Sequence, residues 1–252
     1  MSGHSKWKTI KHQKGVADAR RGQAFTRLAR EIAMAAREGG GSPEGNIRLR
    51  LAIEKARAGS MPKDNIDRAI KRGTGEDKEG ATFETVMYEG YAPHGAALLM
   101  QVVTDNKNRS VADLRRHVTR AGGTMAEAGA VSWQFTRKTY VTVPAEGNDP
   151  DNIFMLAADA GADDVLPGDT EIEIFAPADK FGTVVHALDN AGVKIDESEL
   201  RMEPNQKLEL PPDQAVQVMK LIDQLEELDD VQSVFTNLEI TDAAVQALEA
   251  AA

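Results

Sequence analysis

ADARRGQAFTRLAREIAMAAREGGG, residues 17–41, carries the clearest helical period in the chain. Its apolar residues recur on one face at 100° per residue, the spacing of an amphipathic helix. They are Phe25, Leu28, Ala29, Ile32, Ala33 and Ala36. Three consecutive glycines at the end of the stretch favour termination. The pattern predicts a helix from about Ala17 to Arg37 that buries one face.

The opposite face of this helix carries arginines, with only Glu31 of opposite charge beside them. They are Arg20, Arg27, Arg30 and Arg37. Two interpretations stay open: a solvated face, or a face that contacts phosphates.

Two further helices follow. Ser42-Pro43 predicts the start of one that ends near Ala58, because proline suits the first helical position. It has two apolar stripes, so we expect it to lie in the middle of a three-helix unit. The third helix follows Met61-Pro62 and ends at Gly73, with its basic side opposite the buried face. That basic side consists of Arg68, Lys71 and Arg72.

Residues 2–16, which include the basic stretch GHSKWKTIKHQKG at 3–15, have no clear period and predict a flexible or loosely ordered arm. The aromatic Trp7 has two equally weighted roles: stacking on an exposed base, or packing the arm against the helices. The other candidate contacts are Lys6, Lys8, Lys11, His12, Lys14, Arg20 and Arg21.

Charge is divided unevenly along the chain. Residues 1–75 hold 17 Lys and Arg against 7 Asp and Glu, a net charge of +10, within a chain of net charge −10. The remaining residues therefore carry −20. Positive charge gathered at one end is typical of proteins that bind polyanions. We expect a basic helical domain at 1–77, because Gly73–Gly80 reads as a linker.

Beyond the linker the pattern changes to short strands and helices, as in an α+β fold. Strands are predicted at Glu84–Tyr91, Ala96–Val103 and Val131–Phe135, with a helix from Arg109 to Ala121. The helix carries Arg109, Arg115, Arg116 and Arg120, which are either a second nucleic-acid surface or, slightly favoured, contacts to the acidic body of the same protein.

Residues 137–204 predict the order β-α-β-β-α-β, which is ferredoxin-like. The later helix after Pro211-Pro212 and the strand Val231–Phe235 are too few to form a domain. We therefore predict an N-terminal three-helix domain followed by two α/β sandwich domains. One, at 137–204, is ferredoxin-like and inserted in the other, which spans 78–136 plus 205–252.

Four segments together resemble the YebC family: GHSKWKTIKHQKG, MPKDNIDRAIKRG, YEGYAPHG and DDVQSVFTN. The resemblance runs along nearly the whole chain and implies a three-domain fold. Members are commonly described as DNA-binding transcriptional regulators. Mitochondrial relatives are described as translational activators, and bacterial ones have been linked to the ribosome.

Other classes of function find little support in the sequence. It contains no cysteine, no P-loop and no GxSxG or HExxH motif, and its histidines lack metal-ligand spacing. No apolar run approaches the roughly 20 residues of a membrane span. We expect a cytoplasmic, non-enzymatic protein without cofactor, metal, membrane or small-molecule substrate.

The remaining choice concerns the target. The family description favours a transcriptional regulator that binds DNA. The lack of a base-reading helix favours a translation factor that binds ribosomal RNA, with the acidic domains free to contact basic ribosomal proteins.

Overall fold

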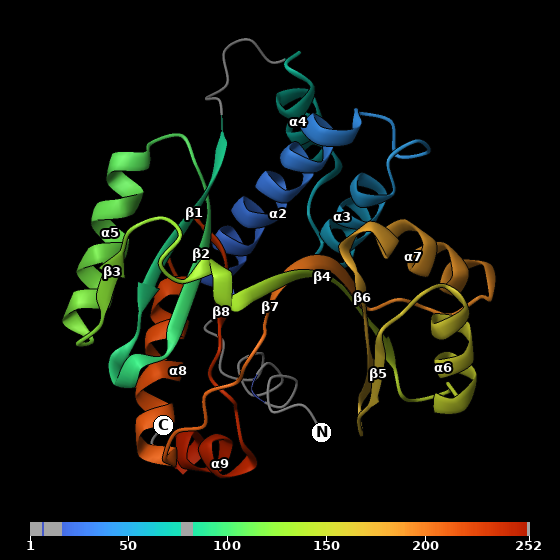
Figure 1. Ribbon diagram of the computed structural model, residues 1–252. Coiled ribbons are helices and arrows are strands. Elements are labelled where there is room, and N and C mark those ends of the chain that lie inside the picture. Colours follow the sequence, from blue (N-terminus) through green and yellow to red (C-terminus); the bar gives the residue numbers. More distant parts are fainter. Residues whose placement is uncertain (1–6, 8–16, 77–82, 251–252) are drawn as a thin grey trace.

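The computed structural model describes Trp7, residues 17–76 and residues 83–250. Three helices near the N-terminus lie across two sheet-containing parts, each covered by its own helices (Figure 1). This arrangement confirms the predicted α+β fold class.

The helical part consists of α2 (Ala17–Gly39), α3 (Ile47–Ala58) and α4 (Lys63–Thr74). Its central helix is α2, which packs against both of the others. The apolar cluster between them includes Ile32, Leu49 and Ile66, all almost fully buried. The first helix and its buried face thus agree with the prediction from residues 17–41.

The start of α3 differs from the prediction. The cap is Asn46, whose side-chain oxygen accepts a hydrogen bond from the backbone N–H of Leu49, and Ser42-Pro43 lies in the preceding loop. The second apolar stripe of α3, Ile47 and Leu51, packs on the cluster of the inserted domain. α3 is thus packed on two sides, as its two stripes predict. The prediction that it lies in the middle of the three-helix unit is wrong, because α2 is the middle helix and the second neighbour of α3 is the inserted domain.

Gly73 does not end the third helix. The helix continues to Thr74 and is capped by Gly75, whose φ of 78° is left-handed. Gly73 instead allows α2 to approach closely, because a Cβ there would lie 2.2 Å from the carbonyl oxygen of Ala33.

The first sheet has the strand order β3-β1-β2-β8. Its last strand, far along the chain, pairs antiparallel with β2. Helices α5 and α8 contribute to the apolar cluster on one face of this sheet, and α9 adds to it. The elements are β1 (Glu84–Tyr91), β2 (Ala97–Thr104), α5 (Lys107–Arg120), β3 (Thr124–Ala126), α8 (Pro212–Glu226), β8 (Val231–Thr236) and α9 (Asp242–Ala250).

One predicted strand of this part is wrong. Residues 132–134 form a 3₁₀ turn, η2 (Ser132–Gln134), and β4 begins only at Phe135. The short strand β3 has no counterpart in the prediction. The reason is that backbone N–H groups of this turn bond a side chain instead of a strand: Val131 and Ser132 both donate to Glu89.

The second sheet has the order β5-β6-β4-β7, with every pair antiparallel, as in a ferredoxin-like fold. Helices α6 and α7 cover one face. The sheet lies within the span of the first, because β8 returns to β2 after it. The elements are β4 (Phe135–Pro144), α6 (Pro150–Asp159), β5 (Asp164–Pro167), β6 (Glu171–Pro177), α7 (Phe181–Asn190) and β7 (Glu197–Pro204), with a short 3₁₀ turn at Ala178–Lys180. A further 3₁₀ turn, Pro93–Gly95, joins β1 to β2 in the first sheet.

Candidate nucleic-acid interface

Part of the predicted interface lies outside the described residues. This holds for Lys6, Lys8, Lys11, His12 and Lys14. Arg20 and Arg21 belong to α2, but the description does not extend to their side chains. These seven remain predictions from the sequence.

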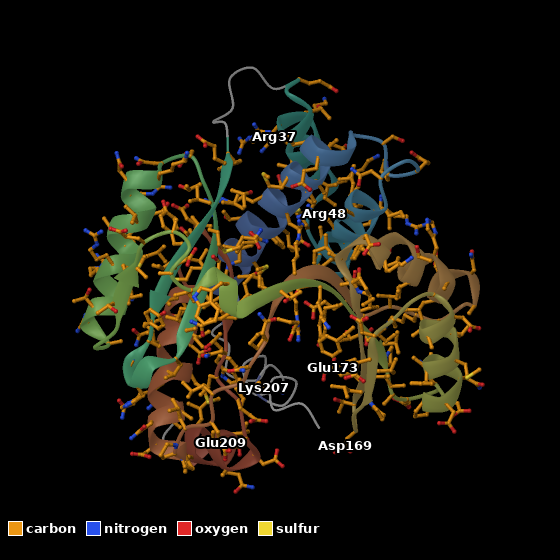
Figure 2. All side chains as sticks on the ribbon, viewed as in Figure 1. Arg37, Arg48, Asp169, Glu173, Lys207 and Glu209 are labelled. Carbon is orange, nitrogen blue, oxygen red and sulfur yellow. The ribbon has the colours of Figure 1, made fainter. Side chains whose placement is uncertain are left out.

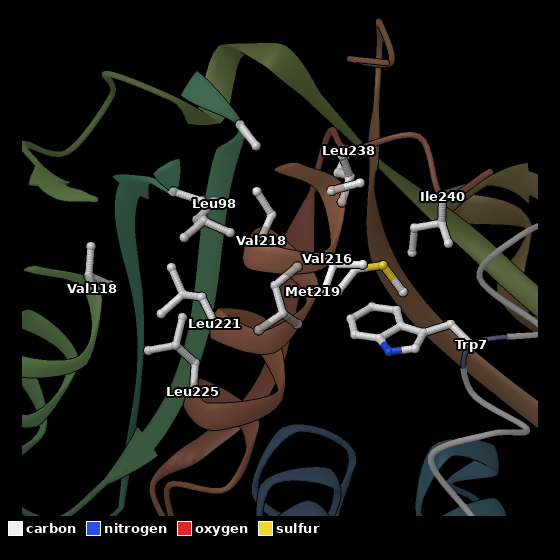
Figure 3. Packing of buried hydrophobic residues seen from close by; sticks show 14 of the residues in the cluster. Trp7, Leu98, Val118, Val216, Val218, Met219, Leu221, Leu225, Leu238 and Ile240 are labelled. Carbon is white, nitrogen blue, oxygen red and sulfur yellow. The ribbon is translucent and has the colours of Figure 1, made fainter. Parts of the chain in front are cut away.

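Trp7 is buried, with 7% of its surface exposed. Its ring lies beside Met219 and Val216 of α8 and near Ile240 (Figure 3). A buried ring cannot stack on a base in this conformation, so the structure favours the packing role. The ring packs on α8, a helix that covers the first sheet, and not on the N-terminal helices as the packing interpretation expected.

Arg30, predicted to contact phosphates, is turned inward. Only 8% of it is exposed, and its Nη2 atom lies 2.9 Å from Oδ1 of Asp230. The other terminal nitrogen, Nη1, donates to the backbone carbonyl of Asp229. The predicted phosphate contact of Arg30 is therefore corrected. Its guanidinium forms a buried ion pair with Asp230, which is 200 residues away in the sequence.

Asp230 is the centre of a network that joins the helical part to the first sheet. Its carboxylate also accepts hydrogen bonds from Arg109 at 2.8 Å, Ser110 at 2.7 Å and Thr104 at 3.0 Å. Burial alone would raise the pKa of Asp230, but these donors and the charge of Arg30 hold it below its ordinary value. The carboxylate is therefore ionised at neutral pH and fixes two arginines.

Arg27 shares this environment. It is half-buried; burial lowers its pKa, opposed by the nearby charges of Glu226 and Asp229. Glu226 ends α8 and Asp229 lies in the turn before β8, so Arg27 is near acids of its own chain, and its predicted phosphate contact stays a prediction.

Two other predicted arginines gather around Phe83, which precedes β1. Arg37 donates to the Phe83 carbonyl at 2.6 Å, and the guanidinium of Arg72 lies 5.4 Å from the centre of its ring. Arg30 approaches the same ring at 5.4 Å. Arg37 nonetheless stays exposed, whereas Arg72 is partly covered.

Arg68 and Lys71 remain exposed on α4, as predicted for the side opposite the buried face. They line a shallow depression that also holds the acids Asp64, Asp67 and Glu76. The local charge of α4 is therefore mixed, and these two cations are balanced in part by their own neighbours.

The arginines of α5 divide into two groups. Arg109 pairs with Asp230 and Asp105, which fits the interpretation that it binds the acidic body of the same chain. Arg115, Arg116 and Arg120 are exposed, and Arg116 makes a surface pair with Asp113 at 3.2 Å. Three arginines thus stay accessible to another molecule.

Both signs of charge occur at each end of the molecule: Glu38 pairs with Arg48 at the helical end, and Lys207 lies among the acids at the other. Arg37 and Arg48 lie at the end formed by α2, α3 and α4, whereas Asp169, Glu173 and Glu209 lie toward the other (Figure 2). A cleft of about 390 Å³ at the acidic end separates the β5–β6 hairpin from the segment before α9. Its charged lining comprises Asp169, Glu171, Glu173, Glu203, Glu239 and Asp242 with Arg201 and Lys207.

Neither a metal site nor a membrane span is found in the part of the chain that the structure describes. No group of three or more acids and histidines there has the geometry to hold a metal ion. None of the helices in 17–76 and 83–250 is long and apolar enough to cross a membrane.

The sequence analysis did not identify three residues that position their neighbours: Phe83, Glu89 and Asp230. Phe83 and Asp230 bind arginines of the helical part, and Glu89 binds the turn before β4. Asp230 had a weak signal, because it forms an acidic pair with Asp229 at the start of a predicted strand. Nothing local marked it as the partner of Arg30.

Comparison with known proteins assigns the whole chain. Residues 5–76 match the TACO1/YebC protein N-terminal domain, and residues 83–238 match the TACO1/YebC second and third domain. Proteins named "Probable transcriptional regulatory protein" from Dehalococcoides mccartyi and Bifidobacterium animalis are 49% and 48% identical, covering 98% and 99% of both chains. The crystal structure of a conserved hypothetical protein from Aquifex aeolicus superposes with a TM-score of 0.82 at 42% identity, covering 89% of this chain and 93% of that one. The chain therefore belongs to the TACO1/YebC family.

Proposed function

We propose that this protein is a cytoplasmic, non-enzymatic regulator of gene expression that binds nucleic acid through its basic N-terminal domain, residues 1–77, with DNA as the first candidate target. The observation that carries the proposal is the separation of charge: +10 in residues 1–75 against −20 beyond them. The exposed Arg37, Arg68 and Lys71 lie in this basic part. The names of the relatives agree with a regulatory role.

Cations already paired within the molecule are weaker candidates for phosphate contacts. Arg30 and Arg109 pair with Asp230, and Arg27 lies near Glu226 and Asp229, so we expect these three to contribute less than freely exposed cations. We expect the phosphate contacts to come from the arm, Lys6 to Lys14, from Arg37, and from the exposed cations of α4 and α5. Acidic side chains at the far end would repel a polyanion and orient it toward the helical end.

A second candidate is a translation factor that docks on ribosomal RNA, with basic ribosomal proteins meeting the acidic cleft. It is favoured by the mixed character of α4: its exposed cations alternate with Asp64 and Asp67, which does not resemble a helix that reads bases in the major groove. Phosphate contacts position a protein without specifying a sequence.

Competitive binding tests both candidates. The purified chain is titrated with duplex DNA, including its own upstream region, and with ribosomal subunits, over a salt series. If about six phosphates are neutralised, the slope of log affinity on log salt for duplex DNA should be about −5. A specific DNA that resists excess random competitor supports the first candidate, and retention on ribosomes alone supports the second.

Matched variants locate the surface. Replacing Arg68 and Lys71 by alanine should weaken binding and make the salt slope shallower by about 1 for each phosphate that is no longer neutralised. The same change at Lys194 and Lys220, exposed cations outside the N-terminal domain, should leave the slope unchanged. Absence of binding to every nucleic acid would refute the proposal.

A further inference from the structure

Trp133 is the most exposed large apolar side chain of the described residues, at 73%. It lies on the turn η2 between β3 and β4, where the predicted strand fails. Side chains two positions away on either side, Val131 and Phe135, are buried against the second face of the first sheet. The backbone therefore buries its neighbours and presents this ring to solvent.

Hydrogen bonds to one buried carboxylate hold the turn in place. Glu89 of β1, only 6% exposed, accepts hydrogen bonds from the backbone N–H groups of Gly129 at 2.8 Å, Val131 at 2.5 Å and Ser132 at 3.0 Å. Burial alone would raise the pKa of Glu89, but these bonds hold it below its ordinary value, so the anchor is charged at neutral pH.

The ring itself is fixed as well. Its indole N–H donates to the carbonyl oxygen of Ala130 at 3.0 Å, and its own backbone carbonyl accepts from Asn205 at 3.2 Å. Asn205 in turn accepts from Thr136 at 2.6 Å. Ordering a ring before it meets a ligand lowers the entropy lost on binding.

We propose that Trp133 is a stacking platform for an unpaired nucleobase, which would make single-stranded or looped nucleic acid a preferred ligand. The proposal rests on the nucleic-acid function proposed above. Because the indole N–H is already bonded to Ala130, the ring offers only its π-surface. Stacking on a π-surface tolerates every base and requires that the base be free of its own duplex stack.

The surroundings favour a base over a protein partner. Aromatic residues that anchor protein interfaces usually sit within an apolar, well-packed patch. The other large apolar side chains exposed among the described residues are Met87, Phe154, Met155 and Leu166. Met87 shares a face of β1 with Glu89 but is only 38% exposed, and the other three belong to the second sheet's domain. The flanks of Trp133 are polar, with Gln134 and the exposed Arg137. Aromatic side chains on which bases stack are a recurring feature of single-strand binding sites.

The exposed arginines of α5 belong to the other side of the sheet. Helix α5 packs on the cluster of Leu98 and Met100, whereas Val131 and Phe135 of the turn pack on that of Ala97 and Leu99. Phosphate contacts by α5 are therefore not part of this proposal.

Fluorescence can isolate this ring, because the chain has only two tryptophans. In a Trp7→Phe background, Trp133 is the sole tryptophan, so excitation at the red edge of the indole band, where tyrosine does not absorb, reports on it alone. A single-stranded oligonucleotide of about 16 nucleotides should quench its emission, whereas a duplex of equal length should not. In the otherwise unaltered chain, Trp133→Ala should weaken single-strand affinity by about 5- to 100-fold and leave duplex affinity within about twofold.

Controls separate stacking from loss of fold. Trp133→Phe, which keeps a ring, should retain most of the affinity, and Phe154→Ala, which removes another exposed aromatic, should change nothing. Unchanged single-strand affinity in Trp133→Ala, while the wild type still binds, overturns this inference and leaves the proposed function standing. Quenching by ribosomal proteins but not by RNA assigns the ring to a protein interface and also overturns it. Absence of binding by the wild type refutes both.

Discussion

Asp230→Asn should destabilise the protein strongly, although it changes one atom in the side chain. The carboxylate is 8% exposed and faces the guanidinium groups of Arg30 and Arg109 and the hydroxyls of Ser110 and Thr104. Asparagine keeps the shape but removes the charge and turns an amide toward groups that donate.

The largest part of the effect comes from Arg30, because it is buried and would lose its counter-ion. Breaking a buried pair in this way costs about 3–5 kcal/mol. Arg109 is half-exposed and keeps Asp105, so its contribution is at most about 1 kcal/mol. We expect a total loss of about 3–5 kcal/mol in the free energy of unfolding.

Urea denaturation at pH 7 measures this loss. The matched control is Asp105→Asn, which removes an exposed carboxylate that also contacts Arg109, and should cost no more than about 1 kcal/mol. The folded-state pKa of Asp230 is lowered, so its contribution is full above the unfolded value of about 3.9 and is lost as the pH falls through the folded value. The difference between wild type and variant should therefore narrow in acid. A loss below about 1 kcal/mol at pH 7 would refute the assigned role of the network.

Three further substitutions test other contacts. Gly73→Ala should destabilise by about 1–3 kcal/mol, because its Cβ would meet the Ala33 carbonyl, whereas Gly22→Ala, with open space around it, should stabilise by about 0.5–1 kcal/mol; equal melting temperatures for the two would contradict the close helix approach. Glu89→Gln should cost about 1–3 kcal/mol at pH 7, since three backbone donors lose a charged acceptor, and this cost should shrink below about pH 4, as the lowered pKa of Glu89 requires; a pH-independent difference in denaturation midpoint would argue against it. Trp7→Ala should lower the unfolding free energy by about 3–5 kcal/mol by opening a cavity beside α8, and an unchanged urea midpoint would show that the ring is not part of this core.

Local patterns predicted much of the fold. The period of α2 and the apolar run of β2 are properties of short segments, and the structure places these elements within a few residues of the prediction. The segment VSWQF also alternates like a strand, but Glu89, 42 residues earlier, takes the N–H of Val131, and the strand does not form there. A local sequence pattern contains no information about a hydrogen-bond acceptor so far away in the chain.

The same limit of local patterns explains why only part of the candidate interface could be predicted. Counting charges showed which end of the chain is basic, because net charge does not depend on folding. Which arginines stay free does depend on it: Arg30 and Arg37 look alike on the helical wheel, yet one meets Asp230 and the other stays exposed. The assigned domain boundaries and the role of residues 8–16 stay predictions.

The position of β8 has a consequence for how the chain folds. β2 ends at Thr104 and cannot pair with β8 until residue 231 has been synthesised, so the first sheet is the last to be completed. Closing so long a loop is entropically unfavourable and slow.

The ferredoxin-like insertion reduces this barrier. Its strands all lie between Phe135 and Pro204, and these two residues are paired partners at its edge. Once the insertion has folded, its entry and exit points are adjacent, and the chain that separates β2 from β8 is effectively shortened by more than half. By the loop-closure relation this saves on the order of 0.6–1 kcal/mol at the pairing step. The insertion thus acts as an internal folding template, which predicts that its sheet gains hydrogen-exchange protection before the sheet that encloses it.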